Sequence, residues 1–268
     1  MQHWYGRYDP STQTARANLP EHPEIDLSSS AFAPSDPVDI TAIFDAAYTQ
    51  AGHPRHVIVT AAVPHRSDKP GRPGDDLFHC LACRPVIGMA VFTLRNNAWL
   101  LESENTAADL SGSNGQAPEV RLVALGTDVH GVRLESHTEA LDYASGNMSL
   151  LVPWRQTVLR AFTAETARSN RGACGPDSPL REPCYALQRT DALVGVPGQQ
   201  YDDLTITASG TEPPSQGEPP PPGNAAHRRE KIEPPLPEPQ AVPVTDVERF
   251  RFREGRYVPL ETNDKGPR

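Results

Sequence analysis

The sequence predicts an α+β, mainly β fold in which one N-terminal helix packs on an antiparallel meander sheet of about eight strands. Most apolar residues alternate with polar ones in short segments bounded by Gly, Pro, Asn or Asp, which is typical of half-buried strands. One segment, after Pro37, instead has its apolar residues at helical spacing. The 29 prolines, about twice the usual share, indicate that much of the remaining chain is extended or looped.

The predicted helix covers residues 37–52. Ser35 or Asp36 would cap its first turn, and Pro37 suits the first helical position, where an N–H would lack a partner in any case. Gly52 would end the helix, because glycine adopts the left-handed conformation of a C-terminal cap without strain. The apolar residues that would share the buried face are Val38, Ile40, Ile43, Phe44 and Ala47.

The clearest hairpin lies at residues 86–103, after a β-branched strand predicted at 56–63. Asn96 and Asn97 form its turn, since asparagine tolerates the positive φ of a type I′ turn. This turn sets two cross-strand pairs, which are Phe92 with Leu101 and Leu94 with Trp99. Further strands are predicted within residues 119–136, 147–162, 185–196, 201–210 and 247–260.

Four regions differ in composition. Residues 1–36 are polar and contain several prolines, which predicts an extended arm. Residues 37–210 form the predicted core domain. Residues 211–244 contain eleven prolines, which predicts a disordered insertion. Residues 245–262 recover alternation, so a C-terminal hairpin that turns at Glu254 and Gly255 is expected to return to the core.

The net charge of −9 argues against a nucleic-acid partner, because phosphate binding requires clustered Lys and Arg. The compact basic cluster at 227–231 lies in the proline-rich region and is interpreted as a solvated linker. The sequence contains no run of about 18 apolar residues, so no membrane span is predicted. The first residues do not resemble a signal peptide, which leaves a cytoplasmic protein or a mature exported protein whose signal peptide has been removed.

The four cysteines, Cys80, Cys83, Cys174 and Cys184, allow three interpretations. A zinc site of two cysteine pairs needs metal-ligand spacing in both, and only the first pair has it. A mixed site of His65, His79, Cys80 and Cys83 is the metal-binding alternative. A thioredoxin-like redox site needs a helix directly after the first pair, whereas the residues after Cys83 predict a strand.

Structural disulfides are therefore the preferred interpretation, and the simplest of three connectivities joins Cys174 to Cys184 and Cys80 to Cys83. Closing the loop between Cys174 and Cys184 would stabilise the fold by roughly 2.5–3 kcal/mol. Because such bonds persist in oxidising compartments, a periplasmic or extracellular location is expected, with a cytoplasmic location as the alternative.

Several segments together resemble a group of uncharacterised proteobacterial exported proteins. They include "HCLACRPVIGMAVF", "GACGPDSPLREPC" and "RFREGRYVPL", and they span roughly residues 40–260. The resemblance implies export and β structure, and it implies no activity. Proteins of that group often carry a histidine between the first two cysteines, whereas this chain has Leu81 there and His79 outside, so no metal role is carried over.

The predicted function is a non-catalytic binding or interaction module of the cell envelope, without a cofactor, whose partner is an unknown protein or envelope component. His130, His137 and Glu139 lie near a strand end, where a His/Glu pair could do acid-base work, but they are interpreted as exposed polar residues. One alternative is a zinc- or copper-binding protein or metal-dependent enzyme that uses the His65, His79, Cys80 and Cys83 set. Another is neutralisation of a secreted toxin or hydrolase by the N-terminal arm.

Overall fold

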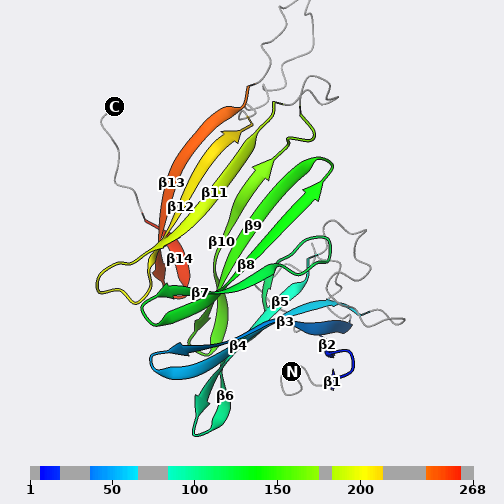
Figure 1. The fold of residues 1–268 in the computed structure, drawn as a ribbon, viewed down its shortest axis with the longest axis vertical. Coiled ribbons are helices and arrows are strands. Elements are labelled where there is room, and N and C mark those ends of the chain that lie inside the picture. The colour runs from blue at the N-terminus through cyan, green and yellow to red at the C-terminus, as the bar shows by residue number, and fades with distance from the viewer. Residues whose placement is uncertain (1–6, 19–36, 66–83, 175–182, 214–239, 261–268) are drawn as a thin grey trace, which may run out of the picture.

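The computed structural model of the protein describes residues 7–18, 37–65, 84–174, 183–213 and 240–260 (Figure 1). In these residues the fold is all-β, with fourteen strands joined by hydrogen bonds. The strands are β1 (Arg7–Asp9), β2 (Thr14–Asn18), β3 (Pro37–Gln50), β4 (His53–Pro64), β5 (Val86–Arg95), β6 (Ala98–Leu110), β7 (Glu119–Gly126), β8 (Val129–Ala140), β9 (Tyr143–Trp154), β10 (Thr157–Ser169), β11 (Ala186–Val194), β12 (Asp203–Glu212), β13 (Val242–Arg253) and β14 (Arg256–Pro259).

The sheet branches at β10. One path runs in the order β1-β2-β3-β4-β5-β6-β10-β11-β12-β13-β14, and β7, β8 and β9 leave it through the pairing of β9 with β10. β10 pairs with β9 along nearly its whole length, but with β11 over only three residues, 167–169. Its contact with β6 is a single parallel bridge between Thr157 and Glu104. Strands far apart in sequence therefore meet at β10.

The predicted α+β class with about eight strands in a simple meander is wrong in three respects. The described residues contain no helix, the strands number fourteen, and the branch at β10 breaks the meander order. The segment predicted to be a helix, 37–52, is strand β3 and the turn that follows it. β3 pairs with β2 on one side and with β4 on the other.

A β-bulge explains why β3 resembles a helix in sequence. The register with β4 shifts between Ala42 and Phe44, so Ile43 is an extra residue in β3. Val38 and Ile40 pack in one apolar cluster, whereas Ile43 and Phe44 pack in another. Because the bulge interrupts the two-residue alternation, the apolar residues fall at spacings of two, three and one, which imitates a helical face.

The strands form three layers around two large apolar clusters. In the middle layer, β7–β10, strand β9 contributes to both clusters, because its adjacent residues Leu150 and Leu151 point to opposite faces. Leu151 packs with Val57 and Ile87, which belong to the β3–β6 layer. Leu150 packs with residues of the β11–β14 layer, such as Leu204. A third cluster lies where β2 meets β3, around Ile40.

The predicted hairpins are confirmed. Asn96 and Asn97 have φ values of 50° and 60°, as a type I′ turn requires. Phe92 pairs with Leu101, and Leu94 pairs with Trp99. At the C-terminus Phe252 pairs with Tyr257 across the Glu254–Gly255 turn, and β13 pairs with β12, so this hairpin does return to the core.

The two regions predicted to lack regular structure are described in part. Residues 7–18 of the predicted N-terminal arm form the β1–β2 hairpin, and β2 pairs with β3. β12 ends at Glu212 and β13 begins at Val242, inside the limits of the predicted disordered insertion. Residues 214–239 of that insertion lie outside the described residues.

Within the described ranges the chain offers no helical segment of the length and apolarity that crossing a bilayer requires.

Aromatic side chains fasten the C-terminal hairpin to the middle layer. Tyr201 stacks on Phe252 with ring centroids 3.7 Å apart, and Trp154 meets the Phe252 ring edge-on at 5.4 Å. Phe162 of β10 meets Phe250 at 4.8 Å. Burial raises the pKa of the Tyr201 hydroxyl. These ring contacts join β9 and β10 to β13.

Gly255 is required where this hairpin turns against Trp154. Its φ is 89°, and a Cβ atom built on it would lie 2.5 Å from Cδ1 of Leu159 and 3.2 Å from Cδ1 of Trp154. We expect Gly255→Ala to lower the free energy of unfolding by about 2–4 kcal/mol, because backbone strain and overpacking add. Urea denaturation followed by tryptophan fluorescence measures this change.

Gly198→Ala is the matched control for Gly255→Ala. Gly198 also has a positive φ, 78°, but a Cβ atom there would have nothing within 4 Å. We expect Gly198→Ala to lower the free energy of unfolding by only about 1–2 kcal/mol, because it introduces backbone strain without overpacking. Equal losses of stability in the two variants would contradict the packing of the Gly255 turn against Trp154.

Candidate functional site

Of the residues predicted for the metal-binding alternative, only His65 lies in the described part of the chain; His79, Cys80 and Cys83 lie outside it. His65 Nδ1 lies 2.8 Å from Oδ2 of Asp39, a carboxylate that is 1% exposed. Arg16 Nε lies 3.3 Å from the other oxygen of Asp39. Among the described residues no group of three or more His, Cys, Asp or Glu side chains is arranged to hold a metal ion.

Cys174 and Cys184 form a disulfide bond, with Cα atoms 5.0 Å apart. This is the pairing that the sequence offers as the simplest. The bond lies just beyond the ends of β10 and β11, which pair over only three residues. It therefore closes the junction between these two strands covalently.

Asn170 joins the same two strands by hydrogen bonds. Its side chain is fully buried, its Nδ2 donates to the carbonyl of Pro183 at 3.0 Å, and its Oδ1 accepts from the N–H of Tyr185 at 2.9 Å. The Asn170 carbonyl accepts from the N–H of Cys174 at 3.0 Å. Asn170 and the disulfide thus fix the backbone on both sides of Arg171.

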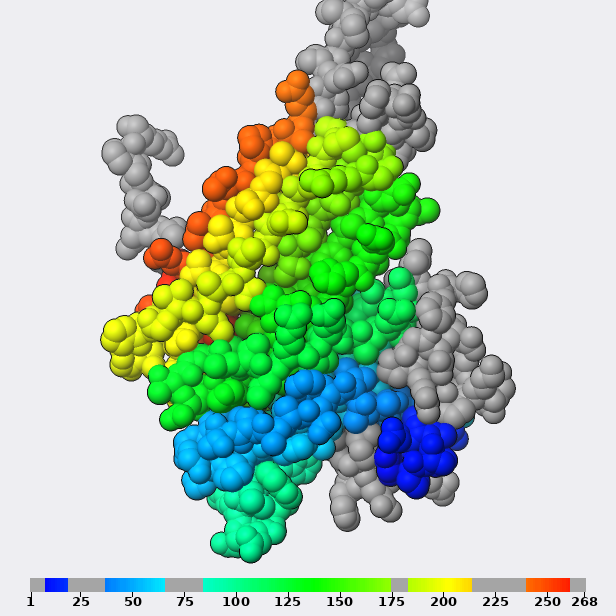
Figure 2. All heavy atoms as spheres, in the orientation of Figure 1, coloured from blue at the N-terminus to red at the C-terminus, as the bar shows by residue number. Residues whose placement is uncertain are grey.

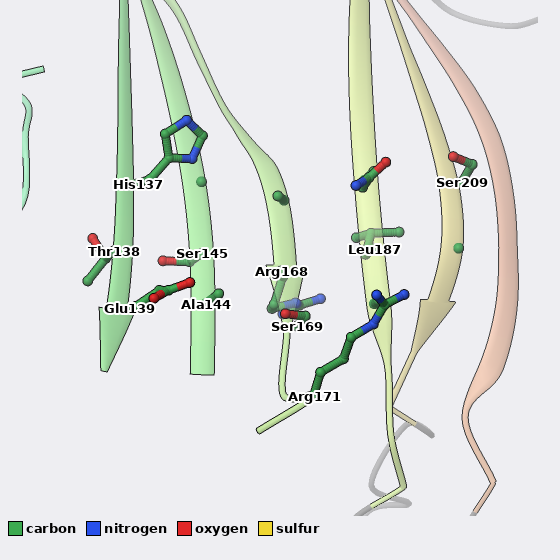
Figure 3. Close-up of a pocket in the computed structure, with 15 residues that line it drawn as sticks. His137, Thr138, Glu139, Ala144, Ser145, Arg168, Ser169, Arg171, Leu187 and Ser209 are labelled. Atoms are coloured by element: carbon green, nitrogen blue, oxygen red, sulfur yellow. The ribbon is translucent and has the colours of Figure 1, made fainter. Parts of the chain in front are cut away.

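A groove of about 490 Å³ lies beside this junction (Figure 3). We call it the β8–β12 groove, because each of these five strands contributes to it. Figure 2 shows the face of the molecule on which these green and yellow strands lie side by side. The lining residues are His137, Thr138, Glu139, Ala144, Ser145, Gly146, Ala167, Arg168, Ser169, Arg171, Ala186, Leu187, Gln188, Ser209 and Gly210.

Strand register explains the groove. In antiparallel sheets directly paired residues lie on the same face. One row of paired residues crosses five strands, and the next row crosses four. The first row is His137, Gly146, Ala167, Gln188 and Ser209, and the second is Glu139, Ala144, Ser169 and Ala186. Small side chains occupy the middle of both rows and form the floor of the groove. The first row ends in His137 and Ser209, and the second runs from Glu139 to Ala186.

Gly146 lets His137 lie over the floor. A Cβ atom on Gly146 would lie 2.7 Å from Oγ1 of Thr166 and 3.1 Å from Nδ1 of His137. The backbone of His137 is held as well, because its carbonyl accepts a hydrogen bond from Oγ of Ser113 at 2.5 Å. A larger residue at position 146 would therefore clash with the Thr166 hydroxyl and crowd the imidazole.

Arg171 reaches across the open end of the groove. Figure 3 shows its side chain extending from the end of β10 toward β11, while the Glu139 carboxylate points toward β9. A guanidinium and a carboxylate therefore lie at the same end of the groove. Both residues are exposed, so both groups remain available to a ligand.

A second hollow of about 500 Å³ continues the groove toward the turn between β8 and β9. It shares four residues with the β8–β12 groove, which are Glu139, Ala144, Ser169 and Arg171. It ends at the turn residues Leu141 and Asp142, and Leu141 is 87% exposed.

Arg133 ties the β8 side of the groove to β11. It forms ion pairs with Glu135, on its own strand, and with Asp191 of β11 at 2.5 Å. Burial disfavours the charged guanidinium, but the hydrogen bond and the negative charge of Asp191 outweigh it and raise the pKa of Arg133. Arg133 and His137 are four residues apart in β8, so their side chains lie on the same face of the strand. The charged cluster around Arg133 therefore lies between the groove and the apolar core.

Sequence reasoning singled out His137 and Glu139 but interpreted them as exposed polar residues, and it missed the rest of the site. These two residues stand out locally, because they are two apart near a strand end. Asn170 and Arg171 carry no local signal, since their roles depend on which distant strand is placed beside β10. His130, which the sequence grouped with His137, lies at the other end of β8 and packs against Tyr48 with ring centroids 5.0 Å apart.

Comparison of the chain with protein-family models, with curated proteins and with solved structures finds no match.

The disulfide can be tested by its contribution to stability. We expect the double substitution Cys174→Ser and Cys184→Ser to lower the free energy of unfolding by roughly 2.5–3 kcal/mol, because it frees a loop with a sequence separation of 10. Urea denaturation of the oxidised protein and of the double variant measures the difference. Identical midpoints and slopes for the two proteins would contradict a structural role for this bond.

Proposed function

We propose that the protein is a non-catalytic binding module that holds an extended, polar polypeptide segment in the β8–β12 groove. The observation that carries the proposal is the form of the groove: two cross-strand rows have small residues in the middle, the first row ends in His137 and Ser209, and the second begins with Glu139. An extended segment can lie flat on such a floor, and the adjoining hollow of about 500 Å³ adds room for further residues of it.

The chemistry of the groove favours a polypeptide over a saccharide. The residues that line the β8–β12 groove include no Phe, Tyr or Trp side chain on which a sugar ring could stack, and the adjoining hollow adds a single tyrosine, Tyr143. They do include hydrogen-bonding groups: His137 and Ser209 lie at the two ends of the first row, and Gln188 lies beside Ser209. Glu139 and Arg171 add charges of opposite sign, which matches the mixed charges of a polar peptide better than a uniformly acidic or basic ligand.

We infer an oxidising compartment, either the periplasm or the cell exterior, as the place where this binding occurs. The Cys174–Cys184 bond supports this location, because disulfides persist there and are rare in the cytosol. The resemblance of several sequence segments to exported proteobacterial proteins agrees with it. An envelope protein is accordingly the expected source of the bound segment.

Metal binding is a second candidate function, and one observation favours it. Asp39 holds Nδ1 of His65 at 2.8 Å, the arrangement by which proteins commonly orient a histidine so that its Nε2 faces a metal ion. This function would make the protein a zinc or copper carrier or a metal-dependent enzyme. Elemental analysis of the purified protein separates the two candidates, since only this one requires a stoichiometric metal.

Peptide display tests the groove. We expect a library of random linear peptides, panned against the immobilised full chain, to yield polar binders whose affinity falls about tenfold or more on Arg171→Ala or on Ala144→Phe. The first substitution removes the guanidinium, and the second fills the floor. Isothermal titration calorimetry of the enriched peptides against each variant measures the change.

Arg249→Ala is the matched control, because Arg249 is an exposed arginine on β13 that does not line the groove. It removes the same charge and should leave the peptide affinity unchanged. Failure to enrich any peptide would contradict the proposal, as would peptides whose affinity is insensitive to both groove substitutions. Stoichiometric zinc or copper that is released only by a chelator would support the metal-binding candidate instead.

A further inference from the structure

The β5–β6 hairpin carries an exposed apolar strand at its end. Trp99, Leu100 and Leu101 are consecutive in β6 and are 49%, 49% and 48% exposed. The last pair that joins β5 to β4 is Thr93 with Arg55, so the hairpin beyond Thr93 has no partner from β4. Figures 1 and 2 show this hairpin, in blue-green, extending past the ends of β3 and β4 at the bottom of the view.

The backbone on the outer side of this strand is open within the described part of the chain. β6 pairs there with β5 alone until Glu104, where the bridge to β10 begins. Residues that flank a two-residue turn exchange hydrogen bonds, and the pattern alternates along the hairpin. Arg95 and Ala98 flank this turn. The N–H and C=O groups of Trp99 and Leu101 therefore point away from β5, toward the open edge.

Another long edge in the described part of the fold, that of β13, is protected, and the contrast with β6 is informative. Residues 242–249 of β13 pair with β12, and β14 covers only 250–253. Pro243 removes one donor from that edge, and Asp246 accepts a hydrogen bond from the N–H of Val247 at 2.8 Å. Proline and charged residues are the usual means by which proteins prevent strand pairing at an edge. The segment 98–101 of β6 has neither.

The exposed segment is complementary to itself. If two copies pair antiparallel about a two-fold axis at Leu100, Trp99 lies opposite Leu101 of the second copy, and Leu100 lies opposite Leu100. Trp99 and Leu101 are the residues whose backbone groups point outward, so each Trp99–Leu101 pair can exchange two hydrogen bonds. The apolar side chains then meet apolar side chains on both faces of the new sheet.

Charge also permits this pairing. Residues 86–101 contain a single ionisable group, Arg95, although the chain as a whole carries a net charge of −9. The nearest acidic group in sequence, Glu102, is neutralised by Arg55 at 2.7 Å. Two hairpin ends can therefore approach with little of the repulsion that two other surfaces of this acidic protein would generate.

We propose that the β6 edge at residues 98–101 is a dimerisation surface, where a second copy of the chain adds its own β6 in antiparallel register about Leu100. The side chains are already positioned, since the Trp99 ring packs against the ring of His56 with centroids 6.0 Å apart. The dimer joins two sheets into one and covers the apolar strand on each copy. This surface is separate from the β8–β12 groove.

Sedimentation velocity of the full chain over a range of concentrations tests the proposal. We expect the wild-type mass to rise to that of a dimer, and Leu100→Lys to raise the dimer dissociation constant at least tenfold, because it places two ammonium groups opposite each other. Val247→Lys is the matched control, since Val247 is an apolar residue, 46% exposed, on the protected edge. It should leave the dimer unchanged.

Cross-linking keeps the proposal testable if Leu100→Lys fails to fold. Leu100→Cys should form a covalent dimer under mild oxidation, because residues directly opposite in an antiparallel pair have Cβ atoms about 5 Å apart. Val247→Cys should not. A wild-type protein that stays monomeric at every concentration would overturn the proposal, and so would a dimer that persists unchanged in Leu100→Lys or equal cross-linking at positions 100 and 247.

Discussion

The pairing of β10 with several strands is the constraint on which the rest of the structure depends. β10 lies along β9 for nearly its whole length, touches β6 at one bridge, and pairs with β11 over three residues. So short a pairing would fray if backbone hydrogen bonds alone held it. Asn170 and the Cys174–Cys184 bond reinforce it from the same side. The β11–β14 layer can therefore diverge from β10 and remain attached to it. The β8–β12 groove lies at this junction, where β10 and β11 are still paired.

The middle layer supplies apolar side chains to both large clusters of the core. Because the central part of β9 is buried on both faces, it contains consecutive apolar residues such as Leu150 and Leu151, and the chain builds two clusters from a modest number of large side chains. Toward the far ends of β8 and β9 the side chains become small or polar. Arg133 and Asp191 mark this change, since they form a charged link between layers at the limit of the apolar region. The groove is thus the polar continuation of a core face.

Local features of the sequence predicted the hairpins but not the way in which they assemble. The turn at Asn96 and Asn97 depends on two residues that tolerate positive φ, so both the turn and its cross-strand pairs could be predicted. The β3 strand could not, because the bulge at Ile43 has no local signature and shifts the apolar pattern to a helical spacing. His137 and Glu139 were recognised as a polar pair, but the small floor residues gain meaning only through register with distant strands. The role of Asn170 in holding β10 to β11 depends on β11 lying next to β10, and no local sequence pattern predicts that pairing.

Amide hydrogen exchange at the β10–β11 junction tests the central claim most directly. The amides to follow are those of 167–170 and 185–188 in the full, oxidised chain, with the amides of the β9–β10 pairing as the internal reference. If Asn170 and the disulfide hold the junction, the N–H of Tyr185 exchanges about as slowly as the reference amides in the oxidised protein. Reduction of the disulfide then accelerates the exchange of Tyr185 and leaves that of the reference amides unchanged. Rapid exchange of Tyr185 in the oxidised protein, or equal acceleration of all these amides on reduction, would contradict the account.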